Sequence, residues 1–180
     1  MSEAFTLVEK LEIISKLHYK VEPSNWLRIS EHGFLLKDTG VTLTLTYSHP
    51  SRAGDPGLDV YLRSEGATIA DASHSLDAWT IEEAIERLEP KMPETIVKKT
   101  SERLFGIPFE KVLYKTDPSQ EQMDEFCLRH ALWTFVSRFG AIMESCEPGE
   151  WFKKELEKRQ QEQSRIERER ARARRILDDL

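Results

Sequence analysis

The chain has 180 residues and a mass of 20.9 kDa, and its 32% charged residues and mean hydropathy of -0.54 are typical of a soluble protein with a buried core. Its formal net charge of -6 is uneven: residues 150–180 carry ten bases against eight acids, or +2, which leaves -8 on residues 1–149. An acidic body argues against general duplex binding, which needs clustered bases on phosphates. No apolar run reaches the roughly 20 residues of a membrane span and no secretory signal opens the chain, so we expect a cytoplasmic protein without a membrane partner.

The first expected element is an amphipathic helix over residues 2–21. Apolar residues recur three and four positions apart along it, which is the helical period. Pro23 ends it, because the residue before a proline is pushed out of helical geometry.

Short strands are expected next, at residues 26–30, 34–37, 41–47, 58–62 and 67–70. The third is the clearest, since Val41, Leu43 and Leu45 alternate with threonines in the period of a half-buried strand. Turn residues separate the strands, so the pattern predicts an antiparallel meander of four or five strands.

The segment after the meander is predicted to be mainly helical. Thr80 and Glu83 match a capping box that starts a short helix ending near Leu88. Residues 94–105 are expected to form a second helix, with Gly106 as its left-handed cap. Residues 107–114 are expected to form an edge strand, because Pro108 cannot donate to a central ladder.

The element that organises this prediction is a long buried helix over residues 117–146. Its apolar residues recur three and four apart, while Phe126 and Trp133 fall on other sides, so we expect other elements to surround it. Cys127 and Cys146 would then lie about 28 Å apart on one helix and could not form a disulfide. The expected fold is α+β, with the meander packed against the first helix and this one in residues 1–148 and a charged helical extension at 149–180.

The extension has the most unusual composition of the chain. Residues 158–175 carry eight bases against three acids, a local charge of +5. We consider as partner-binding residues the arginines Arg165, Arg168, Arg170, Arg172, Arg174 and Arg175. A basic helix can bind an acidic protein surface, associate with itself or lie along nucleic acid, whereas the structural alternative is a solvated helix with Glu–Arg pairs. Polar residues interrupt the heptad seam, so it makes a poor coiled coil.

Two further groups of residues are candidates for a site. His49, Arg52 and Asp55 lie in the loop after the third strand, at a sheet end where binding groups are often displayed.

The second group is Asp71, His74 and Asp77, which could supply a general base with its orienting carboxylate or the start of a metal site. The alternative is a loop whose Asp and Ser side chains satisfy local backbone N–H groups.

Enzyme signatures are missing from the sequence. It has no Gly-rich phosphate loop, no C-x-x-C and no G-x-S-x-G, and Cys127 with His130 lacks further zinc ligands, so we expect no cofactor and no metal. The favoured hypothesis is a non-enzymatic binding protein such as an inhibitor, an immunity-type factor or a chaperone-like bacterial or phage accessory factor. The alternatives are a nucleic-acid accessory protein using the Arg-rich helix and a small enzyme with a site near His49 and His74.

Overall fold

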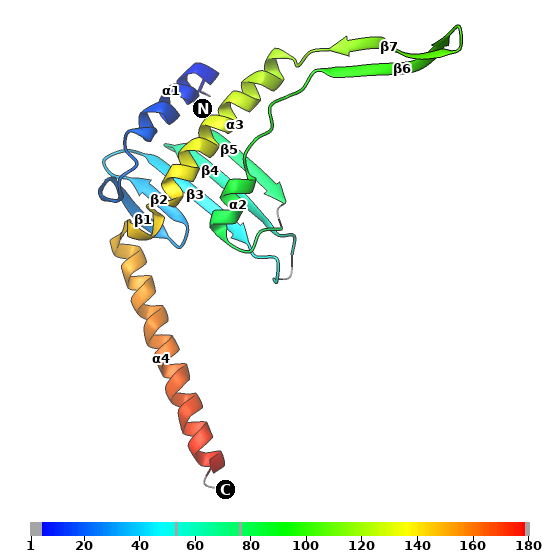
Figure 1. Cartoon of the computed structure of the whole chain (residues 1–180). Coiled ribbons are helices and arrows are strands. Elements are labelled where there is room, and N and C mark those ends of the chain that lie inside the picture. The colour runs from blue at the N-terminus through cyan, green and yellow to red at the C-terminus, as the bar shows by residue number, and fades with distance from the viewer. Residues whose placement is uncertain (1–4, 53, 76, 179–180) are drawn as a thin grey trace.

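The computed structural model describes residues 5–52, 54–75 and 77–178 and is a mixed α+β protein. A six-stranded sheet with three helices on one face forms what we call the body (Figure 1). A two-stranded hairpin projects from one end of the body, and a long C-terminal helix projects from the other. The α+β class predicted from the sequence is confirmed.

The first five strands form the antiparallel meander that the alternation predicted. They are β1 (Trp26–Ser30), β2 (Gly33–Leu36), β3 (Val41–Ser48), β4 (Gly57–Ser64) and β5 (Ala67–Ser75). The sheet order is β5-β4-β3-β2-β1-β8, in which β8 (Glu147–Pro148) adds two residues parallel to β1 and was not predicted. Strand β5 is also longer than expected and continues through the segment that we had considered a loop.

Three helices cover the sheet. They are α1 (Leu7–His18), α2 (Ile81–Arg87) and α3 (Gln120–Gly140). A capping box starts α3, because the Ser119 hydroxyl accepts from the Gln122 N–H at 3.2 Å and the Gln122 side chain accepts from the Ser119 N–H at 2.9 Å.

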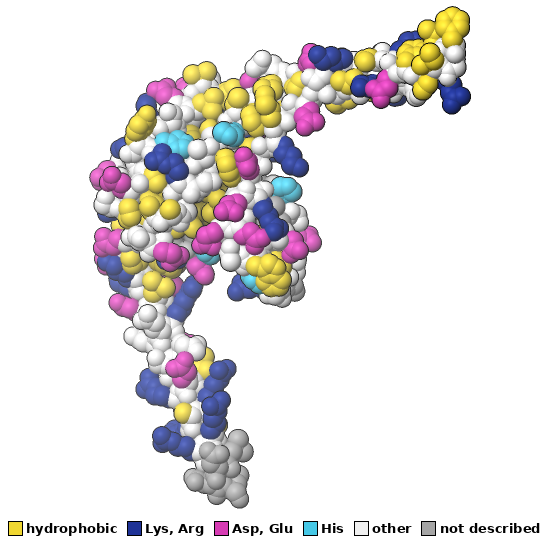
Figure 2. Space-filling view, viewed as in Figure 1, with side chains coloured by type: hydrophobic (Ala, Val, Ile, Leu, Met, Phe, Trp, Pro, Cys, Tyr) yellow, Lys and Arg dark blue, Asp and Glu magenta, His cyan; other side chains and the backbone are white. Residues whose placement is uncertain are grey.

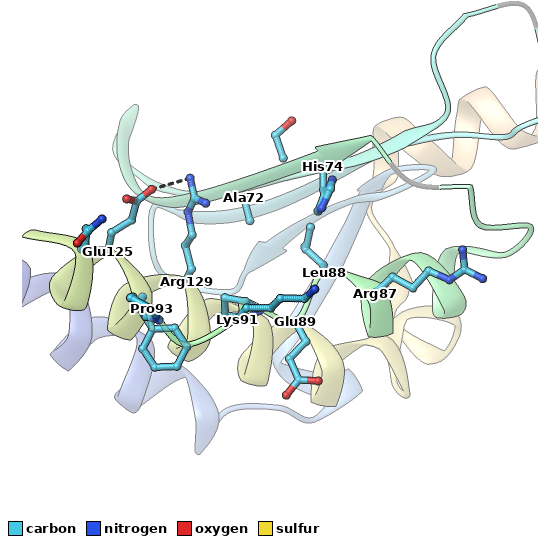
Figure 3. Close-up of a pocket in the computed structure, with 13 residues that line it drawn as sticks. Ala72, His74, Arg87, Leu88, Glu89, Lys91, Pro93, Glu125 and Arg129 are labelled. Atoms are coloured by element: carbon cyan, nitrogen blue, oxygen red, sulfur yellow. Dashed lines mark ion pairs between the residues drawn. The ribbon is translucent and has the colours of Figure 1, made fainter. Parts of the chain in front are cut away.

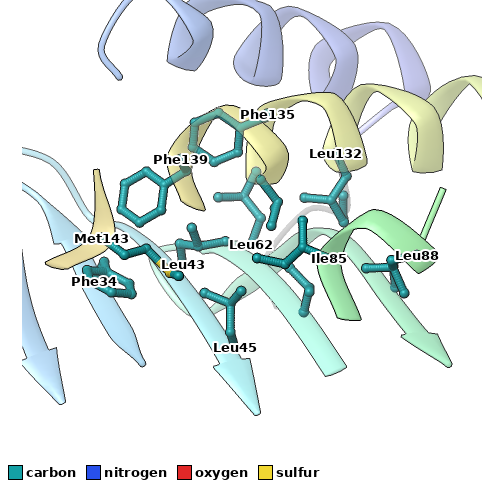
Figure 4. Close-up of a cluster of buried hydrophobic side chains, with 14 of the residues drawn as sticks. Phe34, Leu43, Leu45, Leu62, Ile85, Leu88, Leu132, Phe135, Phe139 and Met143 are labelled. Carbon is teal, nitrogen blue, oxygen red and sulfur yellow. The ribbon is translucent and has the colours of Figure 1, made fainter. Parts of the chain in front are cut away.

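Helix α3 is the centre of the core, as predicted (Figure 4). The Phe139 ring meets Trp26 edge-on at 4.8 Å and Phe34 at 4.9 Å between ring centroids, so strands β1 and β2 pack on its C-terminal half. Nearer the middle of the helix, the Trp133 indole N–H donates to the Ile85 carbonyl oxygen at 3.0 Å, which ties α2 to α3.

The prediction of one helix through residue 146 is wrong. Helix α3 ends at Gly140, and a 3-10 turn, Met143–Ser145, follows it. Met143 and Cys146 are both buried although they lie beyond the end of the helix. The two cysteines therefore do not share a helix: Cys127 is exposed, whereas Cys146 is buried and burial raises the pKa of its thiol.

Residues 94–105 do not form the predicted helix. They contain β6 (Ile96–Leu104), which pairs with β7 (Ile107–Thr116) in a separate two-stranded sheet. Ile96, Val97 and Thr100 are β-branched residues that favour strands, and Gly106 adopts the expected left-handed conformation in the hairpin turn rather than at a helix end. We call residues 95–117 the arm.

Helix α4 (Glu150–Asp178) confirms the predicted C-terminal helix and is anchored only at its start. Phe152 is 3% exposed and lies under the Arg28 guanidinium, 5.5 Å from the ring centroid. The Gly149 N–H donates to the Arg28 carbonyl oxygen at 2.8 Å, which fixes the entry of the helix on β1. Within the described residues, the last ion pair between α4 and the body is Arg159 with Glu31, at 4.0 Å. None of the described helices combines the length and the apolar character needed to cross a membrane.

Candidate functional site: a projecting hairpin arm

The arm leaves the body at the N-terminal end of α3 (Figure 1). The Thr95 hydroxyl donates to the Asp117 carboxylate at 2.7 Å and clamps the two chains together at the root. Beyond this root β6 and β7 are solvent-exposed along almost their whole length. An isolated two-stranded hairpin is at best marginally stable in water, so the arm gains little stability from the body beyond its root.

Cross-strand register divides the arm into two faces, because directly paired residues point to the same side. The first, which we call the apolar face, carries most of the large hydrophobic side chains, Ile96, Leu104, Ile107, Phe109 and Tyr114, together with the charged residues Lys98, Glu102 and Lys111. The second, which we call the basic face, carries smaller apolar residues and three bases: Val97, Lys99, Arg103, Val112 and Lys115. Figure 2 shows the apolar side chains gathered toward the tip of the arm. The arm is therefore amphipathic although it covers nothing in the body.

The tip of the arm combines an exposed aromatic side chain with an unfavourable backbone. Leu104 pairs with Ile107, which leaves a two-residue turn of Phe105 at φ 51° and Gly106 at φ 82°. Asparagine or glycine is usual at the first of these positions, because a bulky residue in the left-handed region costs about 1–2 kcal/mol. Phe105 is nevertheless 96% exposed and gains no packing in the described structure. Neither the turn geometry nor packing within the described structure favours a phenylalanine at this position.

The bases of the arm are largely engaged within it. Lys99 pairs with Glu110 at 2.9 Å, and Lys111 pairs with Glu102 at 3.5 Å. The Lys99 ammonium also holds the pKa of the Glu110 carboxyl below its usual value.

The remaining pairs lie toward the root. Lys115 is 3.7 Å from Asp117, and the Lys98 ammonium lies over the Tyr114 ring, 5.9 Å from its centroid. With four of its five bases engaged in this way, the arm lacks the row of unengaged cations that phosphate binding requires.

A groove lies beside the root of the arm, between the edge of β5 and helix α3 (Figure 3). It encloses about 490 Å³ and is crossed by the chain that leads from α2 to the arm. Its apolar lining consists of Ala72, Leu88, Pro90, Pro93 and Phe126. Arg129, ion-paired with Glu125 at 2.8 Å, closes one end. Within the described residues β5 has β4 on one side and no strand on the other, so its backbone edge is open toward this groove.

Asp71, His74 and Asp77 do not come together as a catalytic or metal-binding group. Because β5 continues to Ser75, Asp71 and His74 are three positions apart on a strand and point to opposite faces. His74 lines the groove, whereas Asp71 is exposed on the other face beside Tyr61. Asp77 follows the strand, and its carbonyl oxygen accepts a hydrogen bond from the Arg87 guanidinium. Among the residues that the structure describes, no cluster of three His, Cys, Asp or Glu side chains is arranged to hold a metal ion.

The loop with His49, Arg52 and Asp55 does lie at the same end of the sheet as the end of β5. The Ser75 hydroxyl donates to the Pro56 carbonyl oxygen at 3.2 Å, which joins the two segments. The His49 ring, however, packs edge-on against Trp79 at 5.2 Å, and its Nδ1 is bonded to the Ser51 hydroxyl at 2.7 Å. The two loops meet, but His49 contacts Trp79 and Ser51, whereas His74 lines the groove. The two imidazoles therefore do not form one acid-base group.

The candidate arginines of α4 lie on its exposed distal half. Arg165 pairs with Glu162 at 2.7 Å and with Glu169 at 3.9 Å, and Arg168 donates to the Ser164 carbonyl oxygen at 3.1 Å. These are contacts within one helix, as the solvated-helix interpretation predicted. Further along the helix, all of the remaining candidates are exposed: Arg170, Arg172, Arg174 and Arg175.

Comparison with known proteins identifies no relative. No family model, no curated protein and no solved structure matches this chain. The function must therefore be argued from the geometry of the chain itself.

Proposed function

We propose that this protein is a non-enzymatic binding protein that uses the arm to hold a protein partner. The observation that carries the proposal is a projecting hairpin with an apolar face and a strained, exposed Phe105, whose strands are exposed along almost their whole length. Exposed apolar surface of this kind marks protein interaction sites in soluble proteins. An inhibitor, an immunity-type factor and a chaperone-like accessory factor all belong to this class.

The engaged bases favour protein over nucleic acid as the ligand of the arm. Coulomb attraction to phosphates would need Lys99 and Lys111 to leave their carboxylate partners, whereas a protein surface can cover the apolar face without disturbing these pairs. Large aromatic side chains such as Phe105 and Phe109 are also the residues that most often dominate protein interfaces.

Capture from nuclease-treated native lysate, with full-length tagged chains, tests the proposal. Phe105→Asn is the sharpest variant, because Asn-Gly is the preferred sequence of this turn and the arm should become more stable while losing its aromatic tip. We expect the captured protein to fall at least about tenfold with Phe105→Asn, the effect of a typical hot-spot residue.

A matched pair of double variants separates the two faces of the arm. Ile107→Thr with Phe109→Thr removes hydrophobic side chains from the apolar face and keeps strand-forming residues, and Val97→Thr with Val112→Thr does the same on the basic face. The first should abolish capture and the second should preserve it. Equal capture by the wild type and all these variants would refute binding by the arm.

A nucleic-acid accessory role for α4 is the second candidate, supported by the +5 charge of residues 158–175 and by exposed arginines near the end of the helix. Truncation after Gln160 removes six of the eight bases of this segment without touching the Phe152 anchor. Binding to duplex DNA that falls steeply with salt and disappears on truncation would establish this role. Weak binding of equal strength in the full-length and the truncated chain would exclude this role.

A further inference from the structure

The open edge of the sheet and the arm have complementary properties. Strand β5 has regular pairing with β4 from Ala70 to Ser75, and its outer edge is not paired in the described structure. It contains no proline and no lysine, the residues that usually protect an exposed edge. Such an edge can accept an added strand through backbone hydrogen bonds.

The arm offers one suitable strand for this edge. Strand β7 carries Pro108, which lacks an N–H, and a bulge where Lys98 pairs with Tyr114 and Lys99 with Val112. Both features protect an edge against pairing. Strand β6 has neither feature, and its nine residues are enough to pair with the regular part of β5, Ala70 to Ser75, beyond the register shift at Ile69. The outer edge of β6 is therefore the one available for pairing.

We propose that the partner of the arm is a second copy of this chain: β6 of each copy adds to the β5 edge of the other, and the apolar face of the arm covers the groove beside α3. This inference rests on the proposed function and deepens it by naming the partner. The result is an isologous dimer in which each copy both gives an arm and receives one, the symmetry most common in soluble oligomers.

Charge supports a copy of this chain as the occupant. The arm strands, residues 96–116, carry five bases and two acids, or +3, whereas residues 1–95 and 117–149 carry eleven bases and twenty-two acids, or -11. At the edge itself, β5 contributes Asp71, and β6 contributes Lys98, Lys99 and Arg103 against Glu102. Attraction between the arm of one copy and the body of another favours both encounter and register.

The two faces of the arm also fit the two sides of this edge. With the apolar face over the groove, Phe109 and its neighbours would lie toward Phe126 and Leu88, which line the groove. The basic face would then share the outer face of the sheet with Asp71 and Ser73. The alternative orientation would turn the large hydrophobic side chains of the apolar face, Phe109 and Tyr114 among them, to solvent, so burial of these side chains favours the first arrangement.

The first test is the mass of the full-length chain by light scattering, at concentrations on the order of 100 µM, far above the Kd of specific interfaces. We expect twice 20.9 kDa for the wild type. Ile107→Thr with Phe109→Thr should give the mass of one chain, and Val97→Thr with Val112→Thr should remain dimeric. A wild-type monomer, or a dimer that survives the apolar-face variant, would overturn the inference.

Ser73 provides a test of the β5 edge that leaves the arm intact. Ser73→Glu should tighten the dimer and Ser73→Lys should weaken it, each by about tenfold in Kd, because two symmetric contacts with the basic face change at once. Thr46→Lys is the control, since Thr46 lies in the same cross-strand row but on β3, two strands from the edge. An equal effect of lysine at both positions would mean that the arm docks elsewhere.

If the wild type is monomeric yet lysate capture depends on Phe105, the proposed function stands and only the second copy is excluded. A high-mass species removed by nuclease would instead support nucleic acid.

Discussion

Strands β3 and β6 show what differs between the body and the arm. In β3, Leu43 and Leu45 are buried against the helices, so the alternation of apolar and polar residues is explained by the core of the same chain. In β6, Ile96 and Leu104 also lie on one face of the strand, yet Ile96 is 62% exposed and Leu104 is 59% exposed. Equivalent side chains are thus covered in one strand and uncovered in the other. The difference teaches that a regular strand pattern can be satisfied by the core of the chain in the body and left exposed in the arm.

In the body, the largest loss of stability is expected from Trp26→Ala. Trp26 is fully buried against Phe135 and Phe139, and its indole N–H donates to the Lys20 carbonyl oxygen at 3.0 Å. We expect a loss of about 3–5 kcal/mol in the free energy of unfolding, measured with urea.

Trp79→Ala is the matched control for Trp26→Ala, because 62% of the Trp79 side chain is exposed. It should change the free energy of unfolding by less than about 1 kcal/mol. Similar losses in the two variants would mean that the core is not centred on the contact between β1 and α3.

Phe152→Ala tests where the body ends and α4 begins. Because Phe152 is buried and lies under Arg28, its removal leaves a cavity at the root of the helix and should cost about 3 kcal/mol in the free energy of unfolding. Trp151→Ala is the control one residue earlier, where the side chain is exposed and the cost should be below about 1 kcal/mol. Equal costs would show that α4 is not anchored through Phe152.

The same contrast explains which elements could be predicted from the sequence. The meander and α3 were predictable because burial against one core leaves a regular period: Leu43 and Leu45 repeat every second residue, and Leu132, Phe135, Val136 and Phe139 repeat every third or fourth. The arm has no core face to impose such a pattern. Its charged residues suited a helix, and the Gly106 signal fits both a helix cap and a hairpin turn.

The candidate site was harder to predict than the fold. Side-chain chemistry alone suggested the loop with His49, Arg52 and Asp55 and the group around His74. In the structure His49 packs against Trp79, whereas His74 lines the groove. The signal for the arm was present in Phe105-Gly106 between two stretches that contain β-branched residues, Ile96, Val97 and Thr100 before it and Ile107 and Val112 after it. It could be recognised as a hairpin turn, but the exposure of its strands depends on the absence of tertiary contacts, which local sequence does not encode.

A smaller effect is expected from pH, through the contact between α1 and α3. The pKa of His18 lies below the ordinary value of 6.5, chiefly because burial penalises the imidazolium and also because Arg138 is adjacent, with Nη1 at 3.3 Å from His18 Nδ1; the Ala131 backbone opposes the shift. The unfolded chain therefore binds this proton more readily. The stability contributed by neutral His18 is complete above pH 6.5 and is lost as the pH falls through the folded-state pKa.

Thermal unfolding of the wild type and His18→Gln between pH 7.5 and about 5 measures this contribution, since the range spans the ordinary histidine pKa. The wild type should lose stability faster than the variant as the pH falls, because glutamine cannot take up the proton. Parallel curves would show that other groups cause the decline and that His18 is as free to ionise in the folded protein as in the unfolded chain.

The smallest effect is expected from truncation after Gln160, which leaves Phe152 and the Arg159 ion pair with Glu31 in place. The removed residues contact one another along the helix, as Arg165 does with Glu162, and such exposed pairs contribute at most about 0.5 kcal/mol each to the helix itself. The melting temperature of the body should therefore shift by less than about 4 °C, the change that 1 kcal/mol produces in a domain of this size. A larger fall would place the distal helix within the cooperative unit. An unchanged melting temperature, combined with the large effect of Phe152→Ala, would show that the start of α4 unfolds together with the body. The distal half of α4 would then contribute nothing to the stability of the body.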